Sequence, residues 1–354
     1  MEIIERLAFR HGAGCALLVS LLFLPTPIAA QVEISARASR MTIGGRVHTQ
    51  FVHSSVEGDK SSDFFLSRAR LVFELSLNDF VEGRLEHDFV VGLRDAFLRL
   101  NFDPAFRVSA GQFKRAFDLF ELYSTTQLQT IERAGGIPGL AVCPGVGGIC
   151  SLSQFRLEYS ARDIGVRVDG VLGEASYLAT LTNGTGSNSG DENGAKSFAG
   201  RLVYPLMDGV RLGANVSVHD YPSSGGADEL ATAYGGDVEI GEYLKEGVHL
   251  QAGIIAGDNW KAGEEVRFVT AQAVLMDYIA VDWWPGRVTA VEPMARVSWG
   301  DPQNDIDEDG GTLLTPGIAV YFTDRTRLGA NLDVYLPQEG DREYSLKVQA
   351  YIWF

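Results

Sequence analysis

Residues 210–219 read Val-Arg-Leu-Gly-Ala-Asn-Val-Ser-Val-His, with an apolar side chain at every second position. The same alternation recurs in residues 68–77 and 327–336. A period of two gives a β-strand one apolar and one polar face, because successive side chains point to opposite sides. The alternative is a soluble β-sandwich, whose strands are usually about five or six residues long. Runs of about ten residues instead predict strands that cross a membrane, with lipid on one side and water on the other.

Alternating runs of this kind follow one another along most of the chain and predict a closed all-β barrel. We expect sixteen antiparallel strands, at residues 41–53, 64–77, 80–91, 93–102, 106–113, 162–172, 174–183, 196–205, 209–219, 232–242, 246–256, 265–277, 289–299, 312–322, 326–336 and 343–354. An even number suits a closed antiparallel barrel with both chain ends on one side. Weak alternation in 152–160 leaves open a count that differs by one hairpin.

The connections between the predicted strands divide into short turns and long polar loops. The short turns include residues 78–79, 103–105, 172–174, 205–209, 244–246 and 323–325. The long loops are residues 54–63, 184–195, 220–231, 257–264, 300–311 and 337–342. This division is typical of short periplasmic turns and extracellular loops in transmembrane β-barrels. The last run also ends in Phe354, which resembles the assembly signal of bacterial outer-membrane proteins.

The first thirty residues predict a secretory signal peptide. Arg6 and Arg10 precede an apolar run at residues 15–24, and small residues lead to an expected cleavage site between Ala30 and Gln31. A run of about ten apolar residues is too short to be a membrane anchor. Residues 1–30 are therefore expected to be removed, and residues 31–354 to form one outer-membrane β-barrel domain.

Composition and motifs exclude several classes of function. The net charge of −16 disfavours nucleic acid as a partner, because phosphate binding needs clustered Lys and Arg. Beyond the N-terminus no run of eighteen uncharged apolar residues predicts a membrane-spanning helix. The chain lacks the HExxH and GxSxG motifs of hydrolases, and the acidic loop 301–310 lacks the closing Glu of a calcium loop. We expect no enzymatic activity, no cofactor and no metal.

Two cysteines remain after the signal peptide, Cys143 and Cys150, in a segment rich in Gly and Pro. In an exported protein an isolated pair of this kind predicts a disulfide, with a metal site as the alternative.

Nine short segments between residues 45 and 204 carry a family resemblance. They are residues 45–51, 65–71, 84–89, 95–98, 111–114, 131–134, 162–166, 182–184 and 199–204. Their order and spacing resemble the phosphate-selective porin O and P family of Gram-negative outer membranes, and residues 291–298 are similar to a late family strand. The resemblance implies a sixteen-stranded barrel, usually a homotrimer.

Cationic residues on the polar strand faces are the candidate site. They are Arg46, Arg68, Arg70, Arg84 and Arg99. The segment 114–154 is too long for a plain hairpin loop and carries Lys114, Arg115 and Arg133. The resemblance implies that this segment is a third loop folded into the barrel to form the constriction. It also implies that Arg68, Arg70 and Lys114 line an anion path, with Asp95 near the same throat. The alternative is structural, with the arginines paired to carboxylates across the wall.

These observations predict an outer-membrane porin for passive diffusion of small anions, with phosphate or polyphosphate as the expected solute. A general or weakly selective diffusion porin, an outer-membrane barrel enzyme and a non-conducting structural barrel are the alternatives. The expected partners are small anions, outer-membrane lipid and lipopolysaccharide, and two further copies of the chain.

Overall fold

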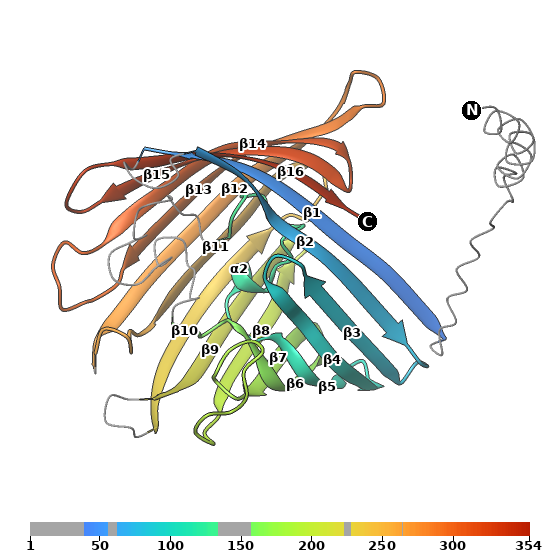
Figure 1. Cartoon of the computed structure of the whole chain (residues 1–354), viewed down its shortest axis with the longest axis vertical. Helices are drawn as coiled ribbons and strands as arrows, with labels where there is room; N and C mark the ends of the chain where they lie inside the picture. Colours follow the sequence, from blue (N-terminus) through green and yellow to red (C-terminus); the bar gives the residue numbers. More distant parts are fainter. Residues whose placement is uncertain (1–38, 56–61, 134–156, 223–227, 264) are drawn as a thin grey trace, which may run out of the picture. The chain divides into compact units, whose positions relative to one another are not determined.

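The computed structural model describes residues 39–55, 62–133, 157–222, 228–263 and 265–354 (Figure 1). Within these residues sixteen strands form one closed antiparallel barrel, each paired with its neighbours in the chain. The strands are β1 (Arg40–Ser54), β2 (Ser62–Ser76), β3 (Val81–Asp88), β4 (Gly92–Asp103), β5 (Phe106–Lys114), β6 (Arg162–Leu172), β7 (Ala175–Thr182), β8 (Ser197–Met207), β9 (Val210–Pro222), β10 (Asp228–Ile240), β11 (Gly247–Asp258), β12 (Arg267–Trp283), β13 (Val288–Asp301), β14 (Gly311–Thr323), β15 (Thr326–Pro337) and β16 (Glu343–Trp353). The predicted fold class is confirmed.

The barrel closes where β1 pairs with β16, from Arg46 opposite Trp353 to Ser54 opposite Ser345. The backbone of Gly45 exchanges two hydrogen bonds of 3.0 Å with the backbone of Phe354, one in each direction. The final residue of the chain therefore completes the seam between the first strand and the last.

The two faces of the barrel wall have opposite character. On β15, Leu328 is 42% exposed and faces outward, whereas Asp333 is 1% exposed and faces the lumen. On β9, Leu212 and Val216 are exposed while Ser217 is fully buried. A soluble protein buries its apolar side chains and exposes its polar ones. This barrel does the reverse, as a barrel surrounded by lipid requires. Among the described residues no helix is long and apolar enough to cross a bilayer.

Several strands depart from their predicted ends, and for two of them the local reason is clear. β3 stops at Asp88 rather than residue 91, because the Asp88 carboxylate accepts a hydrogen bond of 3.0 Å from the amide of Val90 and starts a tight turn. β12 continues to Trp283 rather than residue 277. Its register against β13 shifts between Ala280 and Trp283, so the alternation there is broken although the strand continues.

The third loop connects β5 to β6 and is described at residues 115–133 and 157–161. It contains the short helix α2 (Leu119–Leu122), whose first turn begins with Asp118 accepting a hydrogen bond from the amide of Phe120. The loop runs inward, as predicted, since the amide of Ile131 donates a 2.6 Å hydrogen bond to Asn331 on β15. Figure 1 shows α2 within the ring of strands.

A hydrophobic core forms inside the barrel, between the third loop and the wall from β8 to β13. Its buried members are Ala116, Phe117, Leu119, Phe120, Leu157 and Tyr159 from the loop, and Ala199, Ala231, Ala233, Ile255, Phe268, Val274, Met276 and Met294 from the wall. Small wall residues such as Ala231 and Ala233 leave room for the loop's aromatic rings. This core fills the lumen on that side and leaves the larger open space along β1 to β7.

Candidate functional site

A cavity of about 330 Å³ lies between the third loop and the wall formed by β1 to β7. Nine cationic side chains line it: Arg46, Arg68, Arg70, Arg84, Arg94, Lys114, Arg133, Arg162 and Arg167. Two carboxylates, Glu86 and Asp95, line it as well. In a chain of net charge −16, this concentration of positive charge is local to one wall of the lumen.

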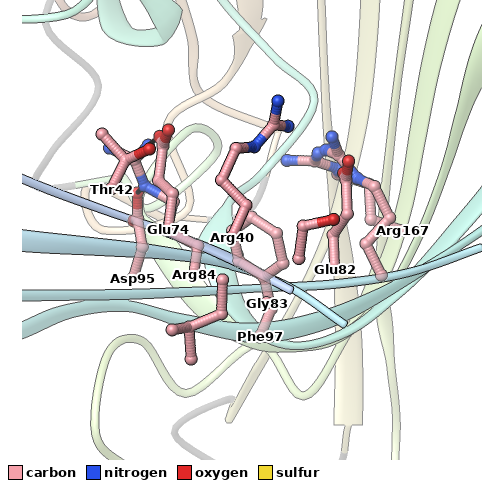
Figure 2. A pocket seen from close by; sticks show the side chains of 12 residues that line it. Arg40, Thr42, Glu74, Glu82, Gly83, Arg84, Asp95, Phe97 and Arg167 are labelled. Atoms are coloured by element: carbon pink, nitrogen blue, oxygen red, sulfur yellow. Dashed lines mark hydrogen bonds and ion pairs between the residues drawn. The ribbon is translucent and has the colours of Figure 1, made fainter. Parts of the chain in front are cut away.

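A second cavity of about 480 Å³ adjoins the first and is lined by residues of β1 to β4 and by Arg167 of β6 (Figure 2). The two cavities share Arg84, Asp95, Phe97 and Arg167, so they form one path along the wall. Figure 2 shows Glu74, Arg84 and Asp95 grouped at one side of the second cavity, with Glu82 and Arg167 at the other. Acidic side chains are therefore more frequent here than in the first cavity.

Most of the lining arginines are held by carboxylates across the wall. Arg70 lies 2.8 Å from Glu86 and 2.5 Å from Asp88. The other close pairs join Arg84 to Glu86 at 2.8 Å, Arg162 to Asp95 at 2.6 Å, Arg167 to Asp169 at 3.2 Å and Arg46 to Glu86 at 3.5 Å. These ion pairs match the structural alternative, in which the arginines pair with carboxylates of the wall. The pairs hold the arginine side chains in place.

Lys114 lines the first cavity, but its ammonium group is occupied by the third loop. It donates hydrogen bonds to the backbone carbonyls of Glu121 and Tyr123 and lies 3.8 Å from the Glu121 carboxylate. Arg133 reaches the same place, with a 2.6 Å hydrogen bond to the Tyr123 carbonyl and a 3.4 Å ion pair with Glu121. Burial lowers the pKa of Arg133, while Glu121 opposes that shift. These two cations fix the end of α2 against the wall.

Arg115 lies outside both cavities. Its guanidinium group is buried and donates hydrogen bonds to the Glu158 carbonyl at 2.7 Å and to Ser217 on β9 at 3.1 Å. Burial lowers its pKa to about 10, so it stays charged at neutral pH. Arg115 was predicted to line the anion path, but in the structure it anchors the third loop to the wall and lines neither cavity.

The structure brings together most of the predicted site. The first cavity contains Arg68, Arg70, Arg84, Asp95, Lys114 and Arg133, and the second contains Arg99. Arg99 lies 3.6 Å from Asp169. The predicted disulfide between Cys143 and Cys150 and the predicted signal peptide lie outside the described residues.

Sequence reasoning missed three lining arginines, Arg94, Arg162 and Arg167. Arg167 could have been found, because it stands on the polar face of an alternating strand together with Asp169. Arg162 pairs with Lys114 across β5 and β6, a proximity that depends on strand register. Arg94 could not have been found from alternation, because it sits at an irregularity in the ladder between β3 and β4.

The opposite wall neutralises its own charges. Lys347 lies 2.6 Å from Asp333 and 3.4 Å from Glu132 of the third loop, and Arg296 lies 3.2 Å from Asp333. Burial would raise the pKa of Glu132, but Lys347 and a hydrogen bond from Gln50 hold it below its ordinary value. This balanced network attaches the loop and contributes little net charge to the lumen.

The profile of the phosphate-selective porin O and P family matches residues 41–252, which include every residue that lines the first cavity. The chain belongs to this family. It is therefore an outer-membrane porin, and its barrel forms a channel of the outer membrane. The predicted family and location are confirmed.

Solved structures share the fold of this porin at low sequence identity. The outer membrane channel DcaP of Acinetobacter baumannii is 14% identical, with a TM-score of 0.62, over 91% of this chain and 99% of that one. An anion-selective porin from Comamonas acidovorans is 14% identical, with a TM-score of 0.61, over 89% and 99%. The trimer form of OmpT from Vibrio cholerae is 14% identical, with a TM-score of 0.56, over 89% and 99%. A search among curated proteins found no match to this chain.

Proposed function

We propose that this porin conducts small anions by passive diffusion, with phosphate or polyphosphate as its preferred solute. The observation that carries the proposal is the lining of the first cavity, where nine cations face two carboxylates. The similarity to an anion-selective porin is consistent with it.

An anion that enters the first cavity loses part of its hydration shell, and the cationic side chains compensate for that loss. A cation about 4 Å from an anion contributes about 4 kcal/mol at the effective dielectric of a protein surface, before the cost of desolvation. Guanidinium groups also present forked donors that match the oxygens of phosphate. Ion pairs such as that of Arg84 with Glu86 moderate the field, so that an anion is attracted without being trapped. We therefore expect passage with weak binding.

We further propose that the functional unit is a homotrimer in contact with lipopolysaccharide. A trimeric relative with the same fold supports the first part. The acidic loop that follows β13, with Asp305, Asp307, Glu308 and Asp309, supports the second, because divalent cations can bridge carboxylates to anionic lipid.

The experiment is reconstitution of the purified porin in a planar bilayer under a KCl gradient. We expect discrete channel openings and a reversal potential of the sign set by chloride. Added inorganic phosphate should then reduce the chloride current in a saturable manner. A reversal potential close to zero would support the general diffusion porin instead, and a cation-directed potential or absence of conductance would refute anion passage.

A further inference from the structure

The ladder between β3 and β4 contains a β-bulge at Arg94. Glu86 pairs with Asp95 and the next residue, His87, pairs with Leu93, which leaves Arg94 without a partner. An extra residue of this kind changes the direction of a side chain relative to strict alternation. Asp95 and Arg94 consequently both line the first cavity, although consecutive strand residues normally face opposite sides. Without the bulge Arg94 would face lipid.

A second bulge lies at Ser67, where β2 pairs with β1. His48 pairs with Arg68 and Thr49 pairs with Leu66, so Ser67 is the unpaired residue. Ser67 and Arg68 both line the first cavity, and Arg68 donates a 3.4 Å hydrogen bond to the Ser67 hydroxyl. The bulge on β4 therefore places Arg94 in the lumen, whereas the bulge on β2 places Ser67 beside Arg68, which faces the lumen by ordinary alternation with Arg70.

These two arginines share a further property. Within the part of the chain that the structure describes, Arg68 and Arg94 have no ion pair with a carboxylate, whereas the other seven cations of the cavity each have one. Among the described residues, the Nε atoms of Arg68 and Arg94 are buried without a hydrogen-bond partner, as are those of Arg84 and Arg107. Carboxylates cancel much of the charge of the seven paired cations, whereas Arg68 and Arg94 have no such partner among the described residues.

We propose that Arg94 is a further selectivity-determining residue of this channel, and that with Arg68 it supplies the two uncompensated guanidinium groups that hold a permeating oxyanion. The inference rests on the proposed anion passage and specifies which cations bind the permeating anion. The bulge is the device that provides the site, because it allows an arginine and the Asp95 that pairs with Arg162 to face the lumen side by side.

The chemistry defines the kind of solute. An oxyanion presents several oxygens, and one guanidinium group can donate two parallel hydrogen bonds to two of them. Arg68 on β2 and Arg94 on β4 are separated by β3 but line the same cavity, so that both groups can donate to one anion there. Chloride is attracted by the same charge but gains nothing from the forked geometry, so the pair favours oxyanions over chloride.

The test compares Arg94→Gln with Arg107→Gln in the planar bilayer, using inorganic phosphate as the blocker of chloride current. Arg107 is the matched control, since it is an arginine of the adjacent β5 that pairs with Asp169 at 2.5 Å and lines neither cavity. We expect Arg94→Gln to raise the half-blocking phosphate concentration about tenfold or more, as loss of a charge-assisted hydrogen bond implies. Arg107→Gln should raise it less than about twofold, because its charge is already compensated.

Two more variants separate charge from geometry. Arg94→Lys keeps the charge and loses the fork, so chloride preference over potassium should persist while phosphate block weakens. The Arg68→Gln, Arg94→Gln double variant should cost less than the product of the single effects, because both groups bind one anion. Equal phosphate block in Arg94→Gln and Arg107→Gln would overturn the inference while leaving anion passage intact. A wild-type channel without anion preference would overturn both.

Discussion

At the scale of single residues, the environment of an arginine decides what it contributes to the channel. Arg68 and Arg70 stand two positions apart on one strand and face the same lumen. Arg70 is neutralised by Glu86 and Asp88, whereas Arg68 has no carboxylate partner in the described chain. Alternation in the sequence predicts that both face the lumen, but the carboxylates that pair with Arg70 lie on β3. The difference between them depends on strand register and could not be predicted.

One buried carboxylate in the third loop predicts a pH dependence. Burial, with a smaller contribution from Glu121, raises the pKa of Asp118 to about 8 from its ordinary value of 3.8. Between these values the unfolded chain releases the proton and the folded chain keeps it, so stability falls as pH rises. We expect Asp118→Asn to raise the thermal midpoint of unfolding at pH 8 more than at pH 4. The control is Asp208→Asn in an exposed turn, and an equal effect of Asp118→Asn at both pH values would contradict the assignment.

At the scale of elements, one set of contacts holds the third loop through its backbone. Arg327 donates to the carbonyl of Leu128, Asn331 accepts from the amide of Ile131, and Arg296 donates to the carbonyl of Glu132 at 3.0 Å. Almost every residue has both a backbone amide and a carbonyl, so the sequence does not show which of them bind the wall. The family resemblance predicted that the loop folds inward, but the points at which it attaches could not be predicted. The strands could be predicted because apolar and polar side chains alternate along the sequence itself.

Removing one of these attachments should loosen the loop. In Asn331→Ala the buried amide of Ile131 loses its acceptor, at a cost of about 1–3 kcal/mol to the attached state. We expect larger and noisier single-channel currents, because the loop then samples positions that widen the constriction. Gln272→Ala is the control, since Gln272 bonds only to Ser298 within the wall among described residues. Unchanged current noise in Asn331→Ala would show that the remaining contacts suffice.

At the scale of the whole molecule, closure of the barrel depends on the absence of a side chain at Gly45. A Cβ there would lie 2.7 Å from the carbonyl oxygen of Arg70 and 2.6 Å from the ring of Phe354. We expect Gly45→Val to destabilise the closed barrel by about 1–3 kcal/mol, as overpacking commonly does. The measurement is the fraction of protein that keeps the fast, folded mobility on gel electrophoresis as temperature increases.

Gly83→Val is the control for closure, since a Cβ at Gly83 meets nothing nearer than 3.7 Å. If both variants melt at the wild-type temperature, the seam tolerates a side chain at Gly45.

The off-centre filling of the lumen has a consequence for how this channel can evolve. Because the hydrophobic core occupies the side of β8 to β13, the described residues that line the proposed solute path all lie between Arg40 and Leu178. On the proposed function, the side chains that set solute preference are therefore encoded in one contiguous stretch of the gene, which also encodes the third loop. Recombination of that stretch would transfer the path together with the loop's half of the hydrophobic core, so a new transport specificity would be inherited as a block when the new loop packs against the wall of β8 to β13.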